Sequence, residues 1–211
     1  MSVKCSDDEL RFDGGSNGFK RALWAVIAIN GVMFIVEMTA GALAGSQALQ
    51  ADALDFFGDT ATYAISLFVI GMSLRIRATA ALFKGLSLGA MGIWVFGSTV
   101  YHIIVLGVPR AEVMGIVGFL ALVANVTSVL LLLRYQDGDA NVRSVWLCSR
   151  NDALGNIGVM LAAAGVWASG TAWPDLLVAT ILAGLFLWSA FQIVRQALHE
   201  LRHTEVMRTA A

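Results

Sequence analysis

The chain has 211 residues, of which 58% are hydrophobic and only 14% are charged, and its formal net charge is -1. So apolar a composition excludes an ordinary water-soluble domain, and the near-neutral balance excludes the clustered basic surface of a nucleic-acid-binding protein. We therefore predict an integral membrane protein of the all-α class, a bundle of about six transmembrane helices with no space for a second folded domain.

Residues 1–21 form a polar leader that lacks the basic start and apolar run of a cleavable signal peptide. We expect this leader to remain on the mature protein, before a transmembrane domain over 22–198 and a short tail over 199–211. Six apolar segments, each long enough to cross the hydrocarbon core as a helix, are predicted in that domain: 22–45, 50–74, 83–107, 112–133, 145–168 and 174–198.

The basic residues indicate the topology. Nearly all of them fall in the leader, the second and fourth connections and the tail, whereas the opposite side holds Arg110. Both termini are therefore predicted to be cytoplasmic, in the inner or plasma membrane of a prokaryote. Short connections such as Gly45-Ser46-Gln47 predict that sequential helices are antiparallel neighbours.

Acidic residues interrupt the second apolar segment. Asp52, Asp55 and Asp59 follow one another at spacings of three and four residues, which places them in one stripe of a helix. A carboxylate at mid-bilayer costs roughly 2.5 to 3.5 kcal/mol unless it faces a partner, water or an ion. We interpret Asp55 and Asp59 as functional, and we expect Asp52, near the start of the segment, to be hydrated at the membrane surface.

Cys148 and Asp152 form a second pair with the same four-residue spacing, in the fifth segment. A lone cysteine in a membrane helix is usually a small apolar filler, but an aspartate one turn later indicates metal ligation. If the two pairs face each other, they supply the four ligands of a tetrahedral divalent metal: Asp55, Asp59, Cys148 and Asp152. Three oxygens and one sulfur suit Zn²⁺, and its softer relative Cd²⁺, better than Mg²⁺ or Ca²⁺; without the thiol, the site favours Mn²⁺ or Fe²⁺.

Other polar residues within the segments receive no primary role. Glu37 and Asn125 are interpreted as lining a water path or fastening helices by hydrogen bonds, and fastening is the better interpretation of Asn125. On a helix Arg150 projects about 200° away from Asp152, so we expect it to pair with another helix or to extend to the membrane edge. His199 and His203 could form an accessory metal site, although a solvated helix end is the simpler interpretation.

With these features the chain resembles the cation diffusion facilitator family, six-span transporters that export divalent metals in exchange for protons. The resemblance extends over all six segments and rests on residues 30–55, 141–159 and 174–179. It implies a bundle of the cation-efflux type whose transport site lies on the second and fifth helices, at Asp55, Asp59, Cys148 and Asp152.

The chain departs from the family pattern in two respects. Histidine is usual at the position of Cys148, so metal preference and proton coupling stay open here. The chain also ends soon after the sixth span, so we expect no C-terminal cytoplasmic domain of the kind that many relatives use to bind regulatory metal and to dimerise. A homodimer would then depend on contacts between transmembrane helices.

The resemblance implies a secondary transporter rather than an enzyme, with a divalent cation as cargo and no prosthetic group. Zn²⁺ is the first choice, with Cd²⁺, Fe²⁺ and Mn²⁺ as further candidates. Because metal binds deprotonated carboxylate and thiolate, binding expels protons, which is the physical basis for metal/proton antiport. A non-transporting membrane metal sensor or accessory subunit with the same fold is the alternative.

Overall fold

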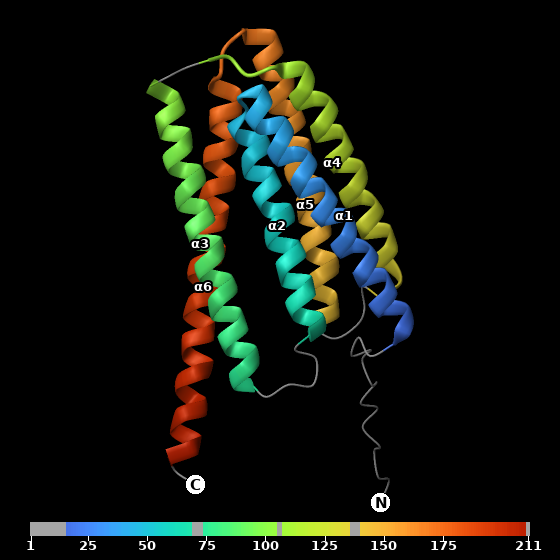
Figure 1. Ribbon diagram of the computed structural model, residues 1–211, viewed down its shortest axis with the longest axis vertical. Coiled ribbons are helices and arrows are strands. Elements are labelled where there is room, and N and C mark those ends of the chain that lie inside the picture. Colours follow the sequence, from blue (N-terminus) through green and yellow to red (C-terminus); the bar gives the residue numbers. More distant parts are fainter. Residues whose placement is uncertain (1–15, 69–73, 105–106, 136–139, 210–211) are drawn as a thin grey trace, which may run out of the picture.

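The computed structural model describes residues 16–68, 74–104, 107–135 and 140–209. These residues form six long helices, which confirms the predicted all-α bundle, and α1 begins at the end of the bundle where α6 ends (the lower end in Figure 1). The elements are α1 (Asn17–Ala44), α2 (Gln47–Phe68), α3 (Leu74–Ile104), α4 (Ala111–Leu132), the short 3-10 helix η1 (Leu133–Tyr135), α5 (Ala140–Ser169) and α6 (Trp173–Thr209).

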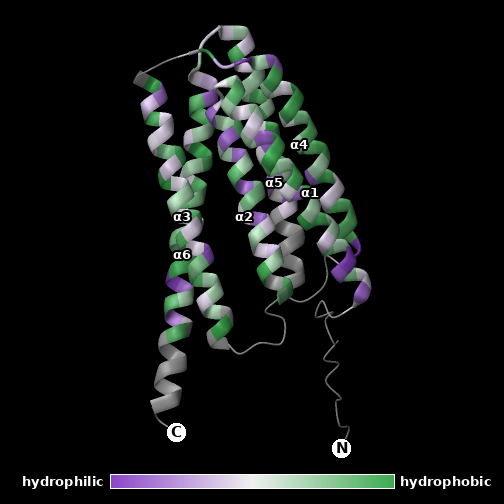
Figure 2. Ribbon diagram, viewed as in Figure 1, coloured by the Kyte–Doolittle hydropathy of each residue, from purple (hydrophilic) through white to green (hydrophobic). Residues whose placement is uncertain are grey.

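The helices differ in how apolar they are. Within the described residues, four segments are long and apolar enough to cross a membrane: Asn17–Ala44, Ala78–Ile103, Ala111–Tyr135 and Trp173–His199. Helix α2 has 22 residues, or about 33 Å of helix, but hydrophilic residues recur along it, whereas α4 is mostly hydrophobic (Figure 2). The described parts of the other two long helices, α2 and α5, are less apolar than these four segments. They are the helices predicted to carry the metal ligands.

The six helices form two groups. Helix α3 packs mainly on α6, while α1 packs on α2 and α4, and α4 packs on α5 (Figure 1). Contacts of α6 with α2 and α5 join the pair to the group of four. Close approach of α3 to α6 depends on Gly85, where an added Cβ would lie 2.8 Å from Val194 Cγ2. The acidic helices α2 and α5 therefore lie in the group of four and also border the α3–α6 pair.

The turn between α1 and α2 is fixed by an acidic side chain from α6. Gly45 ends α1 with φ 72°, a left-handed conformation that glycine adopts without strain. Asp175 then accepts hydrogen bonds from Ser46 Oγ (2.6 Å), Gln47 N (2.8 Å) and Ala48 N (3.1 Å). Because these backbone donors have no partner inside the helix, a carboxylate from α6 caps the start of α2. This contact holds α2 in a defined position relative to α6.

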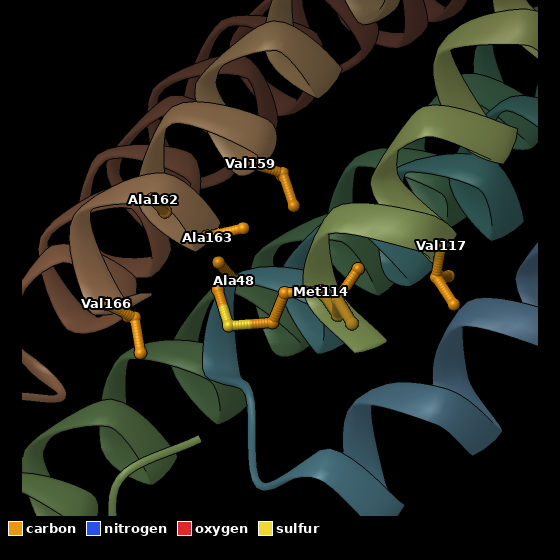
Figure 3. Close-up of a cluster of buried hydrophobic side chains, with 8 residues drawn as sticks. Ala48, Met114, Val117, Val159, Ala162, Ala163 and Val166 are labelled. Carbon is orange, nitrogen blue, oxygen red and sulfur yellow. The ribbon is translucent and has the colours of Figure 1, made fainter. Parts of the chain in front are cut away.

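A cluster of buried side chains packs α2, α4 and α5 together in the upper half of the bundle. Met114 of α4 is fully buried and lies among Ala48 of α2 and Val159 and Ala163 of α5 (Figure 3). In a bilayer, apolar side chains gain little by leaving lipid, so close packing of small residues is what fixes such helices. The packing places α5 beside α2 and so positions the faces that carry the polar residues.

Candidate metal centre

Asp55 and Asp59 lie one turn apart on α2, and both are partly buried. The hydroxyl group of Tyr63, a further turn along α2, donates a hydrogen bond to Asp59 Oδ2. Tyr63 is itself buried in a cluster with Phe19 and Leu23 of α1. The orientation of Asp59 is therefore fixed by a side chain that the packing of α1 on α2 holds in place.

Asp152 of α5 faces these two carboxyl groups. Its side chain interacts at hydrogen-bonding range with that of Asp55 and with that of Asp59, and it too is partly buried. The structure therefore brings together three of the four predicted ligands, from two helices that are separated by about ninety residues of chain.

Cys148, the fourth predicted ligand, belongs to α5 and precedes Asp152 by four residues. Residues four apart share one helix face, so its backbone lies one turn below that of Asp152. Its side chain lies outside the described part of the structure, and ligation by Cys148 stays a prediction.

Asp152 contacts Asp55 and Asp59 separately. Among the described residues, no group of three or more His, Cys, Asp or Glu side chains is already spaced to hold a metal ion. Binding of a metal ion by these carboxyl groups therefore requires their side chains to rearrange.

Lys84 of α3 also lies near the centre, although the sequence analysis grouped it with the basic residues of the second connection and gave it no role at the site. Its ammonium group acts electrostatically on both Asp55 and Asp59, and the side chain is partly buried. The centre is therefore bordered by a positive charge from the α3–α6 pair. The signal available in the sequence was a lysine placed inside an otherwise apolar stretch.

Asp52 differs from its prediction. We expected a hydrated residue, but Asp52 is only 2% exposed, and its Oδ2 accepts a hydrogen bond from Asn156 Nδ2 at 3.2 Å. Asn156 Oδ1 in turn accepts from Asn125 Nδ2 at 3.0 Å, which confirms the helix-fastening role predicted for Asn125. The expectation was wrong because burial of the start of α2 depends on the contacts of α1, α4 and α5, which spacing along one helix does not reveal.

Two peripheral predictions have different outcomes. Arg150 is exposed, in keeping with a side chain that extends to the edge of the membrane. The accessory pair of histidines cannot be placed, because the side chain of His203 lies outside the described residues.

Comparison with known proteins gives one family. Residues 23–202 match the family described as the cation efflux transmembrane domain. Together with the four apolar helices, this match establishes an integral membrane protein.

Several curated proteins are similar to the chain. The zinc transporter ZitB of Yersinia pestis is 30% identical over 203 residues, covering 90% of this chain and 64% of the relative. The metal cation efflux system protein CzcD of Cupriavidus metallidurans is 29% identical over 184 residues, covering 81% and 57%. A cadmium, cobalt and zinc/H(+)-K(+) antiporter of Bacillus velezensis is 26% identical over 204 residues, covering 89% and 64%. The chain thus spans about three fifths of the length of these relatives.

Proposed function

The chain belongs to the cation efflux family, and on this premise we propose that it exports divalent metal ions across the membrane in exchange for protons. Zn²⁺ is the first choice of cargo, with Cd²⁺, Fe²⁺ and Mn²⁺ as further candidates. The observation that supports the proposal most is the contact of Asp152 with both Asp55 and Asp59, between two different helices.

Facing carboxyl groups can exist in two forms. We propose that in the metal-free form protons lie between them and they form hydrogen bonds with each other, which the close approach of Asp152 to Asp55 and Asp59 supports. When a divalent cation replaces the protons, the same oxygens become ligands and separate slightly to surround it. Exchange between these forms is an exchange of metal for protons at one place.

We propose that Cys148 completes the metal-bound form as a thiolate. Its position one turn from Asp152 allows both side chains to reach one ion, and metal binding favours loss of the thiol proton. The resulting set of three oxygens and one sulfur suits zinc or cadmium. Since histidine is usual at this position in the family, the thiol is the residue through which this chain would differ in metal preference.

Access to the centre would change by movement between the two helix groups. All three carboxyl groups are only partly buried, and we propose that a hydrated path reaches them when the two helix groups move apart. Lys84 comes from α3, whereas the carboxylates come from α2 and α5, so a displacement of the α3–α6 pair would alter both the exposure and the electrostatics of the site. Such rocking of one helix group against another around a fixed site is how alternating access operates in many transporters.

The remaining parts of the proposal concern the membrane topology, the bounds of the transport domain and the assembly of the protein. We propose that both termini are cytoplasmic in the inner or plasma membrane of a prokaryote, with 1–21 as leader, 22–198 as transport domain and 199–211 as tail. We also propose that any homodimer forms through transmembrane helices.

Transport by the purified chain in proteoliposomes tests the proposal. We expect zinc uptake coupled to proton release, which Asp59→Ala and Asp152→Ala abolish, while Glu112→Gln, at an exposed position in the first turn of α4, leaves it unchanged. Unaltered flux in the two aspartate variants would remove the site assignment. Zinc binding without transport by the wild-type chain would instead favour a metal sensor or accessory subunit.

A further inference from the structure

Glu37 of α1 is a buried carboxyl group that the proposed metal centre does not use. It is 0% exposed, and neither of its carboxyl oxygens accepts a hydrogen bond from any described residue. What faces it at hydrogen-bonding range is the carboxyl group of Asp52, which is 2% exposed. Two acceptors facing each other in a buried place require a proton or another cation between them.

The amide chain from α4 and α5 indicates which of the two carboxyl groups is ionised. Asn156 donates to Asp52, and the bond from Asn125 to Asn156 Oδ1 fixes the orientation in which the Asn156 amide presents its donor to Asp52. A carboxylate that accepts a hydrogen bond is stabilised in its charged form. Glu37 receives no such bond and is therefore the group that carries the hydrogen.

Burial distinguishes this pair from the metal centre. Asp55, Asp59 and Asp152 are partly exposed, whereas Glu37 and Asp52 are closed to solvent. A hydrated metal ion cannot reach a closed pair without opening the bundle, but a proton moves by short transfers between neighbouring oxygens. Two carboxyl groups already at hydrogen-bonding range also leave no space for an alkali ion between them.

Asp55 couples the Glu37–Asp52 pair to the proposed metal centre. It acts electrostatically on both Glu37 and Asp52, and it is also one of the proposed metal ligands. Asp52 and Asp55 of α2 are the charged groups that act on Glu37, while α5 contributes the neutral amide of Asn156, which bonds Asp52. A negative Asp55 favours a proton nearby, and a metal ion bound to Asp55 removes that effect.

We propose that Glu37 and Asp52 form a dedicated proton-binding site, distinct from the metal centre, that loses its proton when metal binds at Asp55. This inference deepens the proposed antiport and depends on it for its transport consequences. The O–H bond of Glu37 breaks, the proton passes to water and leaves Glu37 as a carboxylate, and metal release allows the reverse transfer. No redox change is involved.

Infrared difference spectroscopy tests the site without requiring transport. In metal-free wild-type protein we expect a carbonyl stretching band of a protonated carboxylic acid that shifts in D₂O, is absent in Glu37→Gln and disappears when Zn²⁺ is added. The exposed Glu112→Gln variant should retain the band. Identical wild-type and Glu37→Gln spectra, or a band that persists in saturating zinc, would overturn the proposal, as would its removal by K⁺ at constant pH.

Proton counting supplies the second measurement. Calorimetric titration with Zn²⁺ in buffers of different ionisation enthalpy gives the number of protons released per metal bound, and Glu37→Gln should release one fewer while its zinc affinity changes less than tenfold. An unchanged proton count would contradict the proposal. If Glu37→Gln does not fold, Asp52→Asn removes the same proton site and is expected to give the same two results.

Failure of the proposed function would be recognised separately. A wild-type chain that moves no metal in proteoliposomes would refute antiport, while the infrared band and its loss in Glu37→Gln would still decide whether the pair holds a proton.

Discussion

Replacement of Asp152 by asparagine should affect the metal-free and metal-bound protein in opposite directions. The substitution keeps the shape of the side chain but removes its charge and supplies an N–H donor. In metal-free protein that donor can bond Asp55 or Asp59 directly, whereas Asp152 must first take up a proton to donate to either of them. One such hydrogen bond contributes about 1 kcal/mol, so Tm in chelator should rise by about 2 to 4 °C for a chain of this size.

In the metal-bound protein the same change removes a charged ligand. Truncating one partner of a buried charge pair costs about 2 to 5 kcal/mol, and a loss near 3 kcal/mol weakens zinc binding roughly 100-fold. At a zinc concentration 100 times the wild-type Kd, binding stabilises the wild type by about 2.7 kcal/mol but the variant by only about 0.4 kcal/mol. The zinc-induced rise in Tm should therefore fall from about 5 to 10 °C to about 1 °C.

Thermal unfolding of purified protein in detergent, followed by intrinsic tryptophan fluorescence with chelator or with zinc, measures both effects. Glu112→Gln is the matched control, because it also removes one carboxylate, at an exposed position. A variant that unfolds earlier than wild type in chelator and keeps the full zinc-induced rise would refute the reasoning, since Asp152 would then be a structural residue rather than a ligand.

Three further predictions concern other residues. Cys148→His should shift relative affinity from Cd²⁺ toward Zn²⁺, measured by competition in calorimetry, and an identical metal ranking would show that the thiol is not a ligand. Lys84→Gln removes a positive charge that acts on Asp55 and Asp59 and repels a bound cation, so zinc affinity should rise, by about 5-fold for each 1 kcal/mol of repulsion removed. Equal affinity would contradict the electrostatic role. Asp175→Ala leaves the backbone donors of Gln47 and Ala48 buried without partners and should lower stability by about 2 to 4 kcal/mol, seen as a fall in Tm that zinc does not restore.

Much of the fold follows from local patterns that the sequence carries directly. Apolar segments of sufficient length predicted the six helices, and Gly45 marked the end of α1 because its left-handed conformation suits glycine. The spacing of Asp55 and Asp59 placed them on one face of α2 because helix periodicity depends only on the backbone.

Contacts between helices were less accessible to prediction. Asp52 lies two residues beyond the start of the second predicted segment, and proximity to that end suggested hydration, but side chains of α1 and α5 enclose it. The capping of α2 by Asp175 joins residues more than a hundred positions apart. The proximity of Lys84 to the acidic residues depends on how α3 lies against α2, which no periodicity in either helix specifies.

X-ray absorption at the zinc edge, on purified chain with one equivalent of Zn²⁺, tests most directly whether α2 and α5 share one metal ion. We predict four ligands, three oxygens at about 2.0 to 2.2 Å and one sulfur at about 2.3 Å, with the sulfur lost in Cys148→Ala and one oxygen altered in Asp152→Asn. A zinc spectrum that is the same in wild type and in Asp152→Asn would contradict a metal centre shared by the two helices.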